Sequence, residues 1–366
     1  MEVQTLELLN FRNYEHATAA FDGGLNVVAG ANGQGKTNLL EAIHLLSALG
    51  SHRVSNLAPL VRHGHDQAIV RGMGTAQRRE VRLDAEIRRE GRLRVLVNRA
   101  TVERGSDAAG ILASVLFSPE DLALVKAGPD ERRRFLDQAA ARLRPGAGAE
   151  RQEFERVLKQ RNGVLRAAAV NPRAKRHLDV WTEQLVVAAA AVVRSRISAL
   201  DALRPPAAAR YVELASAGPT PELSYEATWG SPDSPAGIEG DLTASFEGSL
   251  GKDLDRGITT TGPHRDDLKV TLGDTDARIF ASQGEQRTLA LSLRLAERDV
   301  LTEVKGETPI LLLDDVFSEL DERRRACLAE LVTEAGQTIA TTTSVEGLPL
   351  KGGRTILVSA GSLVDA

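Results

Sequence analysis

Eight consecutive residues near the N-terminus have the types and spacing of a phosphate-binding loop. The run reads Gly30-Ala31-Asn32-Gly33-Gln34-Gly35-Lys36-Thr37 and fits the pattern G-x-x-x-x-G-K-[ST]. Its glycines let consecutive backbone N–H groups turn towards phosphates. Lys36 can reach the β- and γ-phosphates, and the Thr37 hydroxyl can ligate Mg²⁺. We predict that this loop, with Asn38 after it, binds a nucleoside triphosphate, and that Lys36 also takes part in catalysis.

The segments on either side of the loop supply the context that this pattern needs. Residues 25–29 are an apolar run that predicts a buried strand, and residues 38–46 predict a helix. The N-terminus of such a helix adds partial positive charge next to the phosphates. Strand, glycine loop and helix together make a chance glycine-rich turn a poor explanation.

Two carboxylates follow a second apolar run near the C-terminus. Residues 310–313 predict a buried strand, and Asp314 and Asp315 come directly after it. In a parallel sheet both acids reach the carboxyl edge, beside the phosphate loop. Asp314 is predicted to hold Mg²⁺. Asp315 is predicted to orient the attacking water or to take its proton.

A polar pentapeptide precedes the acidic strand by roughly 25 residues. It reads Ser282-Gln283-Gly284-Glu285-Gln286. One interpretation is a capping box, with Ser282 as N-cap and Glu285 reaching back. The other is a similarity to the signature of ABC-type ATPases. There the serine hydroxyl and a glycine N–H, here Ser282 and Gly284, grip the γ-phosphate of ATP held by another subunit. The two are compatible, because a capped helix start also binds anions.

Composition limits the function classes. The chain has 366 residues, enough for two or three domains, and one cysteine, Cys327, so it has no internal disulfide. A reducing, cytoplasmic compartment fits. The N-terminus shows no signal-peptide pattern, and the longest apolar run, residues 185–193, is too short to span a bilayer. With a net charge of −4, any nucleic-acid contact must come from a local basic patch.

Charge is unevenly distributed along the chain. Residues 62–104 hold 11 arginines against 6 acids, and the alternation at 81–88 and 93–97 predicts an antiparallel hairpin with one wet face. That face is either simply solvated or turned towards phosphates. Residues 126–176 hold 14 Lys or Arg against 6 acids, whereas residues 213–267 hold 11 acids against 3 bases.

The middle of the chain predicts helices. Pro129 and the acids after it begin one helix, which Arg144-Pro145-Gly146 ends, with Phe135, Ala139 and Leu143 as its buried stripe. Residues 149–203 predict two antiparallel helices joined at 170–173, an arm on the order of 30 Å long. Leu178, Trp181, Leu185, Ala188 and Val192 form a coiled-coil seam, facing Phe154, Val157, Leu158, Leu165 and Ala168.

The flanking segments complete the prediction. Arg204-Pro205-Pro206 is expected to end the arm, and residues 216–240 to form a loop around one strand at 223–228. Residues 3–9 alternate enough to predict an edge strand.

Motifs spread over nearly the whole length make the chain resemble the RecF family of bacterial recombination mediators, ATPases related to SMC proteins. The motifs are Asn10-Phe11-Arg12-Asn13-Tyr14, the loop with residues 38–43, residues 117–122, residues 133–137, Gly262-Pro263-His264-Arg265-Asp266-Asp267, residues 283–287 and residues 313–321. The Gly-Pro-His-Arg-Asp-Asp run and the short arm separate the chain from long-coil SMC proteins.

The resemblance implies an α/β fold: an ABC-type ATPase head, with a mixed sheet, helices and an antiparallel β subdomain, plus a helical arm with a short antiparallel coiled coil. The expected division is head 1–125, arm 126–256 and head 257–366. Arg12 and Asn13 are expected near the nucleotide. The resemblance also implies dimerisation on DNA with ATP, weak DNA-stimulated hydrolysis to ADP and phosphate, and work with RecR and RecO to bring RecA to gapped DNA in repair and replication.

Some positions depart from the family pattern. Glu285 is acidic where related signatures usually carry a neutral residue, which weakens γ-phosphate binding unless its carboxylate turns to the helix cap. Many ABC ATPases carry a switch histidine that senses the γ-phosphate, and residues 341–344 contain no histidine. Either a hydroxyl takes over this role or the chain has no such switch. The sequence shows no clear glutamine for the glutamine loop that ABC ATPases usually carry, and Glu120 is expected to take its place. His264 fits either a hydrogen-bonded core residue or a site residue.

Other classes stay open on sequence alone. A kinase or GTPase would share the phosphate loop, but the guanine-binding Asn-Lys-x-Asp is missing and a kinase does not need the signature. A transporter subunit would not need the basic arm. Aromatic residues make up only 4% of the chain, so base stacking is a poor source of affinity for DNA. We therefore expect recognition of the backbone of duplex DNA, including duplex beside a gap, with steep salt dependence.

Overall fold

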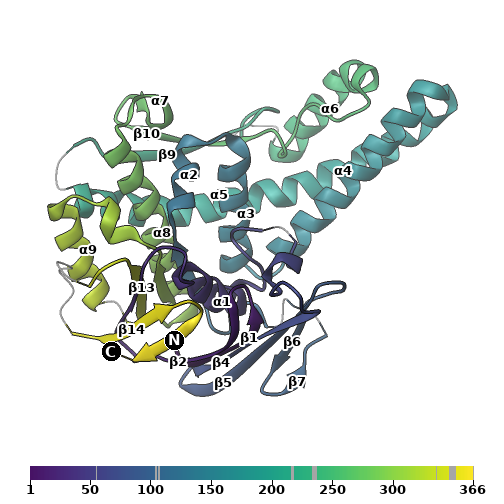
Figure 1. Cartoon of the computed structure of the whole chain (residues 1–366). Coiled ribbons are helices and arrows are strands. Elements are labelled where there is room, and N and C mark those ends of the chain that lie inside the picture. The colour runs from purple at the N-terminus through teal and green to yellow at the C-terminus, as the bar shows by residue number, and fades with distance from the viewer. Residues whose placement is uncertain are drawn as a thin grey trace. The chain divides into compact units, whose positions relative to one another are not determined.

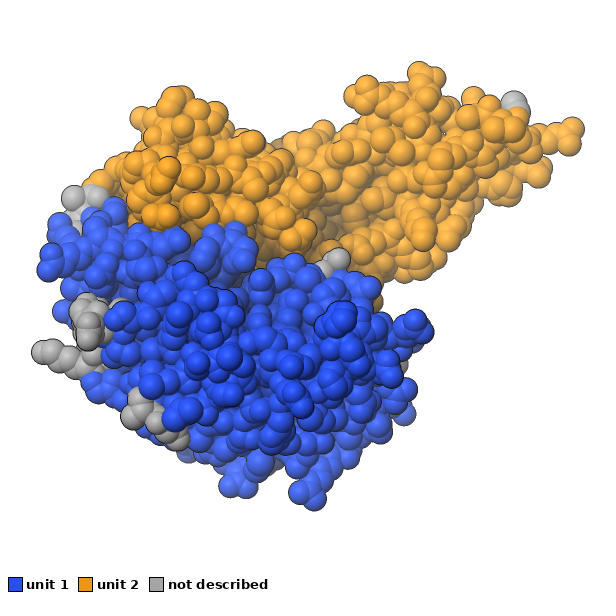
Figure 2. All heavy atoms as spheres, in the orientation of Figure 1, with its two compact units in different colours: residues 1–121, 213–216, 291–366 blue, residues 122–212, 217–290 orange. Residues whose placement is uncertain are grey.

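The computed structural model describes residues 1–54, 56–103, 105, 108–215, 218–232, 237–334, 336–345 and 352–365. It divides into two compact units, which Figure 2 distinguishes by colour. Unit 1 comprises Met1–Asp121, Glu213–Ser216 and Leu291–Ala366, and unit 2 comprises Leu122–Val212 and Ala217–Ala290. The predicted division at 125 and 256 remains a prediction about domains. The compact units differ from it at residues 257–290, which belong to unit 2.

A mainly parallel sheet carries the predicted nucleotide chemistry of unit 1. Its strand order is β15-β14-β3-β13-β12-β8, and only β15 runs antiparallel to its neighbour. The predicted strands at 25–29 and 310–313 are confirmed and are buried along their whole lengths, as both faces of a parallel sheet are covered. The strands are β3 (Leu25–Ala29), β8 (Ser114–Phe117), β12 (Ile310–Leu313), β13 (Thr338–Thr342), β14 (Arg354–Ser359) and β15 (Ser362–Asp365).

A second, antiparallel sheet has the order β2-β1-β4-β5-β6-β7. The hairpin predicted at 81–97 is confirmed as β5 paired with β6. The edge-strand prediction for residues 3–9 is wrong, because β1 pairs with both β2 and β4. Alternation reveals which face of a strand is buried, but not how many neighbours its backbone has. The strands are β1 (Glu2–Phe11), β2 (Tyr14–Ala20), β4 (Gln67–Ala76), β5 (Arg79–Arg88), β6 (Arg94–Val97) and β7 (Ala100–Thr101).

Helix α1 (Lys36–Ala48) lies between these two sheets (Figure 1). Its leucines and Ile43 join one hydrophobic cluster with residues of both sheets, which fixes the helix that follows the phosphate loop. The other helical segments of unit 1 are η1 (Ala58–Leu60), η5 (Val316–Glu319) and α9 (Glu322–Glu334). The segments η3 (Pro119–Leu122), α5 (Leu178–Ala215) and α8 (Gln283–Lys305) run across the division between the units.

Unit 2 is mostly helical and holds a three-stranded sheet of order β11-β10-β9. Its strands are β9 (Pro221–Glu226), β10 (Asp267–Leu272) and β11 (Thr275–Asp276). The predicted strand at 223–228 corresponds to β9; parts of the loop around it, 216–217 and 233–236, lie outside the described residues. The helices are α2 (Ala123–Lys126), α3 (Pro129–Leu143), α4 (Ala147–Val170), η4 (Pro172–His177), α5 (Leu178–Ala215), α6 (Gly237–Arg256) and α7 (Ala277–Phe280).

The predicted pair of antiparallel helices is confirmed as α4 and α5. Cross-helix hydrogen bonds join Glu150 to Ser195 and Arg161 to Thr182, so residue numbers fall along one helix as they rise along the other. The predicted seam residues are buried, except Trp181 and Leu158, which are half-buried. In α3, Pro129 stands in the first turn as predicted, whereas Leu143 is only half-buried and Leu136 and Ala140 complete the buried stripe.

Pro205 and Pro206 do not end the arm helix as predicted, because α5 continues through them to Ala215. Each proline lacks an N–H and forfeits a helical hydrogen bond. Leu203, Ala207 and Tyr211, on one face of this continuation, are all buried. Their burial outweighs the lost bonds. Within the described ranges, every helix is too short or too polar to cross a lipid bilayer.

Candidate nucleotide-binding site

The loop between β3 and α1 has a backbone that only glycine tolerates at key points. Gly33 and Gly35 have φ angles of +80° and +121°, in the left-handed region. A Cβ on Gly30 would lie 2.4 Å from the carbonyl oxygen of Val358, and one on Gly35 would lie 2.6 Å from the Asn13 amide. The spacing of the glycines is therefore required by local geometry and leaves the loop's backbone open to phosphate.

Lys36 opens α1 and turns back over the loop. Its ammonium donates hydrogen bonds to the carbonyl oxygens of Gly30 at 2.6 Å and Ala31 at 3.1 Å. The first turn of α1 contains no acid, so the free N–H groups and dipole of the helix favour an anion there. Residues 30–38 thus fit the triphosphate that the sequence predicts for them.

Asp314 joins the end of β12 to the phosphate loop. Its Oδ1 accepts hydrogen bonds from the hydroxyls of Thr37 at 3.1 Å and Thr341 at 2.7 Å. Burial raises the pKa of the Asp314 carboxyl, against these two hydrogen bonds, which lower it. Hard oxygen donors of this kind suit Mg²⁺, which usually takes one or two protein ligands and completes its shell with phosphate and water. The residues described contain no cluster of three or more His, Cys, Asp or Glu side chains that would hold a metal by itself.

Asp315, the next residue, has a constrained backbone and an unsatisfied side chain. Its φ is +52°, and its N–H donates to the Thr341 hydroxyl at 2.8 Å. Its Oδ1 is buried and has no hydrogen-bond partner. A buried carboxylate oxygen without a donor is costly and calls for an explanation. A water molecule or ligand at this point would satisfy it, which fits the predicted role of Asp315 beside the attacking water.

Asn13 and Tyr14 brace the loop from the turn between β1 and β2. Asn13 donates to the Gln34 carbonyl at 2.8 Å and accepts from the Asn38 amide at 2.8 Å, and the Tyr14 hydroxyl donates to the Gly35 carbonyl at 2.9 Å. Asn13 and Asn38 therefore lie at the loop, as expected. The role of Tyr14 was missed, although it ends the Asn10–Tyr14 motif.

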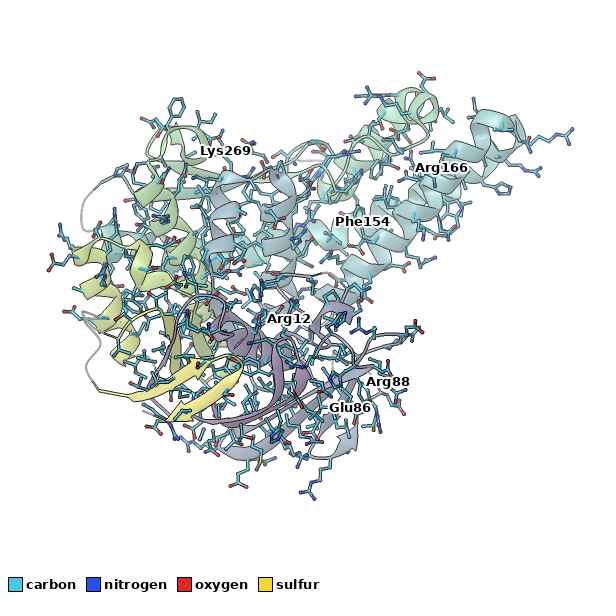
Figure 3. The ribbon with its side chains drawn as sticks, in the orientation of Figure 1. Arg12, Glu86, Arg88, Phe154, Arg166 and Lys269 are labelled. Atoms are coloured by element: carbon cyan, nitrogen blue, oxygen red, sulfur yellow. The ribbon has the colours of Figure 1, made fainter. Side chains whose placement is uncertain are left out.

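Arg12 is bound by an acid of α1, and its expected place near the nucleotide remains a prediction. Its guanidinium donates two 2.8 Å hydrogen bonds to Glu41 on α1, whose side chain is fully buried. Figure 3 labels Arg12. Ser51 donates to the same carboxylate at 2.5 Å, and Arg53 lies 3.8 Å away. Burial by itself would raise the pKa of Glu41, but the Arg12 and Ser51 hydrogen bonds hold it below its usual value. In the sequence, this cluster could have been predicted from Glu41, because an acid on the apolar face of a helix needs a cationic partner.

The signature residues lie at the start of α8, in unit 2. The Ser282 N–H donates to the Glu285 carboxylate at 2.8 Å, and the Glu285 N–H donates to the Ser282 hydroxyl at 3.3 Å. The predicted capping box is thus confirmed. The carboxylate of Glu285 turns to the helix cap, which is the alternative that the sequence left for this acidic residue.

Comparisons with known proteins decide the family. Residues 2–349 match the family model described as the RecF/RecN/SMC N-terminal domain. The protein of Streptomyces avermitilis named DNA replication and repair protein RecF is 40% identical over 99% of both chains. Its namesake in Beutenbergia cavernae is 40% identical over 97% of both. The chain belongs to the RecF family. The kinase, GTPase and transporter alternatives are therefore set aside.

Solved RecF-family structures have the same fold. One, described as the recombination mediator protein RecF-ATP in the RecFOR pathway, is 30% identical, with a TM-score of 0.91 over 100% of this chain and 97% of that one. A RecF-ATPrS structure gives a TM-score of 0.92. An SMC head bound to the winged-helix domain of ScpA shares the fold alone, at 18% identity and a TM-score of 0.58. The predicted fold, an ABC-type head with a helical arm, is confirmed.

The positions that depart from the RecF-family pattern have distinct surroundings. His264 is largely buried and its Nε2 lies 3.0 Å from the Thr259 carbonyl, and burial lowers its pKa, so it resembles a core histidine. Glu120 is exposed and adds to the rise in the Asp314 pKa. The hydroxyl beside Asp314 is that of Thr341, at the place where the missing switch histidine was considered. Whether Glu120 or Thr341 replaces a family residue remains a prediction.

Most arginines of α3, α4 and the turn between them are paired with acids, which lowers the positive charge that they offer to DNA. Arg132, for example, forms a two-pronged pair with Asp267 at 2.7 Å. Within the described chain, by contrast, five exposed cations of α4 and η4 have no acid partner (Figure 3 labels Arg166). The paired group is Arg132, Arg133, Arg134, Arg144, Arg151, Arg156 and Arg161, and the unpaired group, here called the arm-tip cations, is Lys159, Arg166, Arg173, Lys175 and Arg176.

The antiparallel sheet offers a second set of cations. Arg94 pairs with Glu86 on the wet face of the hairpin, at 3.2 Å. Exposed arginines at the strand ends and turns have no acid partner among the residues described, and Figure 3 labels Arg88 as one of them. This set, the hairpin cations, is Arg78, Arg79, Arg88, Arg92 and Arg99.

Proposed function

We propose that this chain is an ATP-dependent DNA clamp of recombinational repair, which dimerises on DNA with ATP and opens after hydrolysis. The observation that carries the proposal is that two helices begin with anion-binding N-termini whose side chains differ. The start of α1 has Lys36, Thr37 and, beside it, Asp314. The start of α8 has Ser282 and Gly284 but no lysine of this kind. Each is one half of a site for a γ-phosphate.

Two copies related by a two-fold axis complete both sites at once. In this arrangement Ser282 and Gly284 of each copy contact the nucleotide that is bound to the phosphate loop of the other copy. ATP then joins the copies through its γ-phosphate, and ADP, which lacks that group, lets them part. The exposed Ile279 and Phe280, directly before the signature, support this use of the surface because large apolar side chains are commonly exposed at interfaces.

Hydrolysis needs few groups. Lys36 and the loop N–H groups hold and neutralise the phosphates, and Thr37 and Asp314 would hold Mg²⁺, which supplies further charge neutralisation. The free Oδ1 of Asp315 orients water for attack or accepts its proton. A single carboxylate base without a lysine or arginine partner among the described residues supports slow turnover, which closure of the dimer and binding of DNA would speed up.

DNA binding is assigned to the arm-tip and hairpin cations. Both sets are exposed, consist of Lys and Arg, and lack interleaved aromatic residues, which favours contacts with the phosphate backbone of duplex and duplex–gap junctions. Solved relatives are described as recombination mediators of the RecFOR pathway. We extend that role to this chain, with RecR and RecO as partners and RecA loading at gaps as the outcome.

Sizing the Ser282→Arg variant tests the proposal. Light scattering is measured without nucleotide, with ADP and with ATP, together with ATP affinity. The wild type is expected to dimerise only with ATP, and Ser282→Arg to bind ATP as a monomer without dimerising. The control is Ala244→Arg, which also replaces a small side chain with arginine, at an exposed position on α6. A Ser282→Arg chain that still dimerises with ATP reduces Ser282 to a helix cap.

A further inference from the structure

Glu285 is hydrogen-bonded to Ser282 at the helix start where Ser282 and Gly284 would meet a phosphate. The Ser282 N–H donates to Glu285 Oε2 at 2.8 Å, and the Ser282 hydroxyl accepts the Glu285 N–H at 3.3 Å. The carboxylate thus lies at the N-terminus of α8, where the helix dipole attracts negative charge. An arriving γ-phosphate, gripped by the Ser282 hydroxyl and the Gly284 N–H, is drawn to the same partial positive charge.

A neutral side chain at this position would cap the helix without this conflict. Glutamine also accepts a hydrogen bond from the N-cap N–H, so the capping box does not need a charge. The carboxylate adds repulsion towards a phosphate that carries several negative charges. The carboxylate and the phosphate therefore compete for the partial positive charge of the same helix start.

We propose that Glu285 is an internal competitor for the γ-phosphate and thereby sets how tightly ATP joins two copies. The inference rests on the proposed ATP-dependent dimer. In the separate chain the carboxylate fills the anion-binding helix start. In the dimer it turns away from Ser282 and gives its place to the γ-phosphate bound by the other copy. The energy of this exchange weakens the dimer, so that copies separate readily after hydrolysis.

The start of α8 keeps other anchors when Glu285 is changed. Gln286 donates from its Nε2 to the carbonyl oxygens of Ala277 and Arg278, each at 3.4 Å. The Thr288 hydroxyl donates to the Gly284 carbonyl at 2.8 Å. These contacts hold the signature segment against α7, so we expect variants at position 285 to fold.

The test compares Glu285→Gln with the wild type by analytical ultracentrifugation of the full chain with ATPγS. Glu285→Gln is expected to dimerise about 3- to 30-fold more tightly, because the charge is removed from two equivalent sites. The difference is expected to shrink at high salt, as screening predicts. The control is Glu303→Gln, which makes the same change at an exposed position of the same helix, away from its start.

A second variant separates charge from capping. Glu285→Ala removes both the charge and the hydrogen bond to Ser282, so it is expected to melt at a lower temperature yet still dimerise more tightly than the wild type. A wild type that dimerises while neither variant does so more tightly overturns this inference and leaves the clamp standing. A wild type that stays monomeric with ATPγS overturns the clamp itself and this inference with it.

Discussion

Arg12 grips the buried carboxylate of Glu41 with two hydrogen bonds of 2.8 Å each. The pair ties the turn between β1 and β2 to α1, the helix that begins with Lys36 and Thr37. Asn13, the next residue, donates a hydrogen bond to the Gln34 carbonyl. The Arg12–Glu41 pair is therefore linked to the phosphate loop through one neighbouring residue. Arg12 therefore supports the shape of the site through Glu41.

Breaking this pair is expected to destabilise the fold. Arg12→Met removes the two Arg12 hydrogen bonds of the buried Glu41 carboxylate, which we expect to cost about 2–3 kcal/mol. Urea unfolding of the two chains measures the loss. The pKa of Glu41 lies below its ordinary 4.5, so its ionised form contributes stability above that pH, which is lost as pH falls through the folded-state pKa. The gap between the chains should narrow in acid; a constant gap would contradict the assigned pair.

Replacing Asp315 separates binding from hydrolysis. Asp315→Asn keeps the size of the side chain and removes the basic oxygen, so we expect ATP binding and dimerisation to persist while turnover falls by about 10²- to 10⁴-fold. Phosphate release and nucleotide titration measure the two effects. Glu322→Gln, an exposed acid at the start of α9, serves as the control. Hydrolysis at the wild-type rate would show that Asp315 is not the base.

Phe280 offers a test of the dimer surface that is independent of phosphate contacts. Its side chain and that of Val187, on α5, are each 69% exposed, so serine at either position should leave the stability of the monomer unchanged. Phe280→Ser is expected to weaken ATP-driven dimerisation at least tenfold, the size typical of a buried aromatic anchor, about 1.4 kcal/mol or more. Val187→Ser should not weaken it. Equal dimerisation of both variants would remove α7 from the interface.

DNA affinity should depend on the unpaired cations and not on the paired ones. Changing Arg173, Lys175 and Arg176 together to glutamine is expected to reduce the slope of log affinity against log salt by about 3 on duplex DNA. Changing Arg151 and Arg156, which already pair with acids, should alter it little. Tighter binding to single strands than to duplex of equal length, with little salt effect, would contradict backbone recognition.

The sequence by itself determined the features that depend on neighbouring residues. The phosphate loop, the start of α3 at Pro129 and the capping box of Ser282 and Glu285 are confirmed because their geometry is closed within a few positions of the chain. Helix caps, positive-φ glycines and hydrophobic periodicity are local signals, and they also carried the resemblance to the RecF family.

Only the tertiary structure decided where long-range partners meet. Arg132 pairs with Asp267, 135 positions away, and Thr37 with Asp314, 277 positions away. Ion pairing of this kind consumed charges that the sequence left available for DNA. Strand pairing on both sides placed β1 inside its sheet, and burial of one helix face carried α5 through two prolines. Burial and charge pairing depend on which distant segments the fold brings together, and local patterns in the sequence do not contain that information.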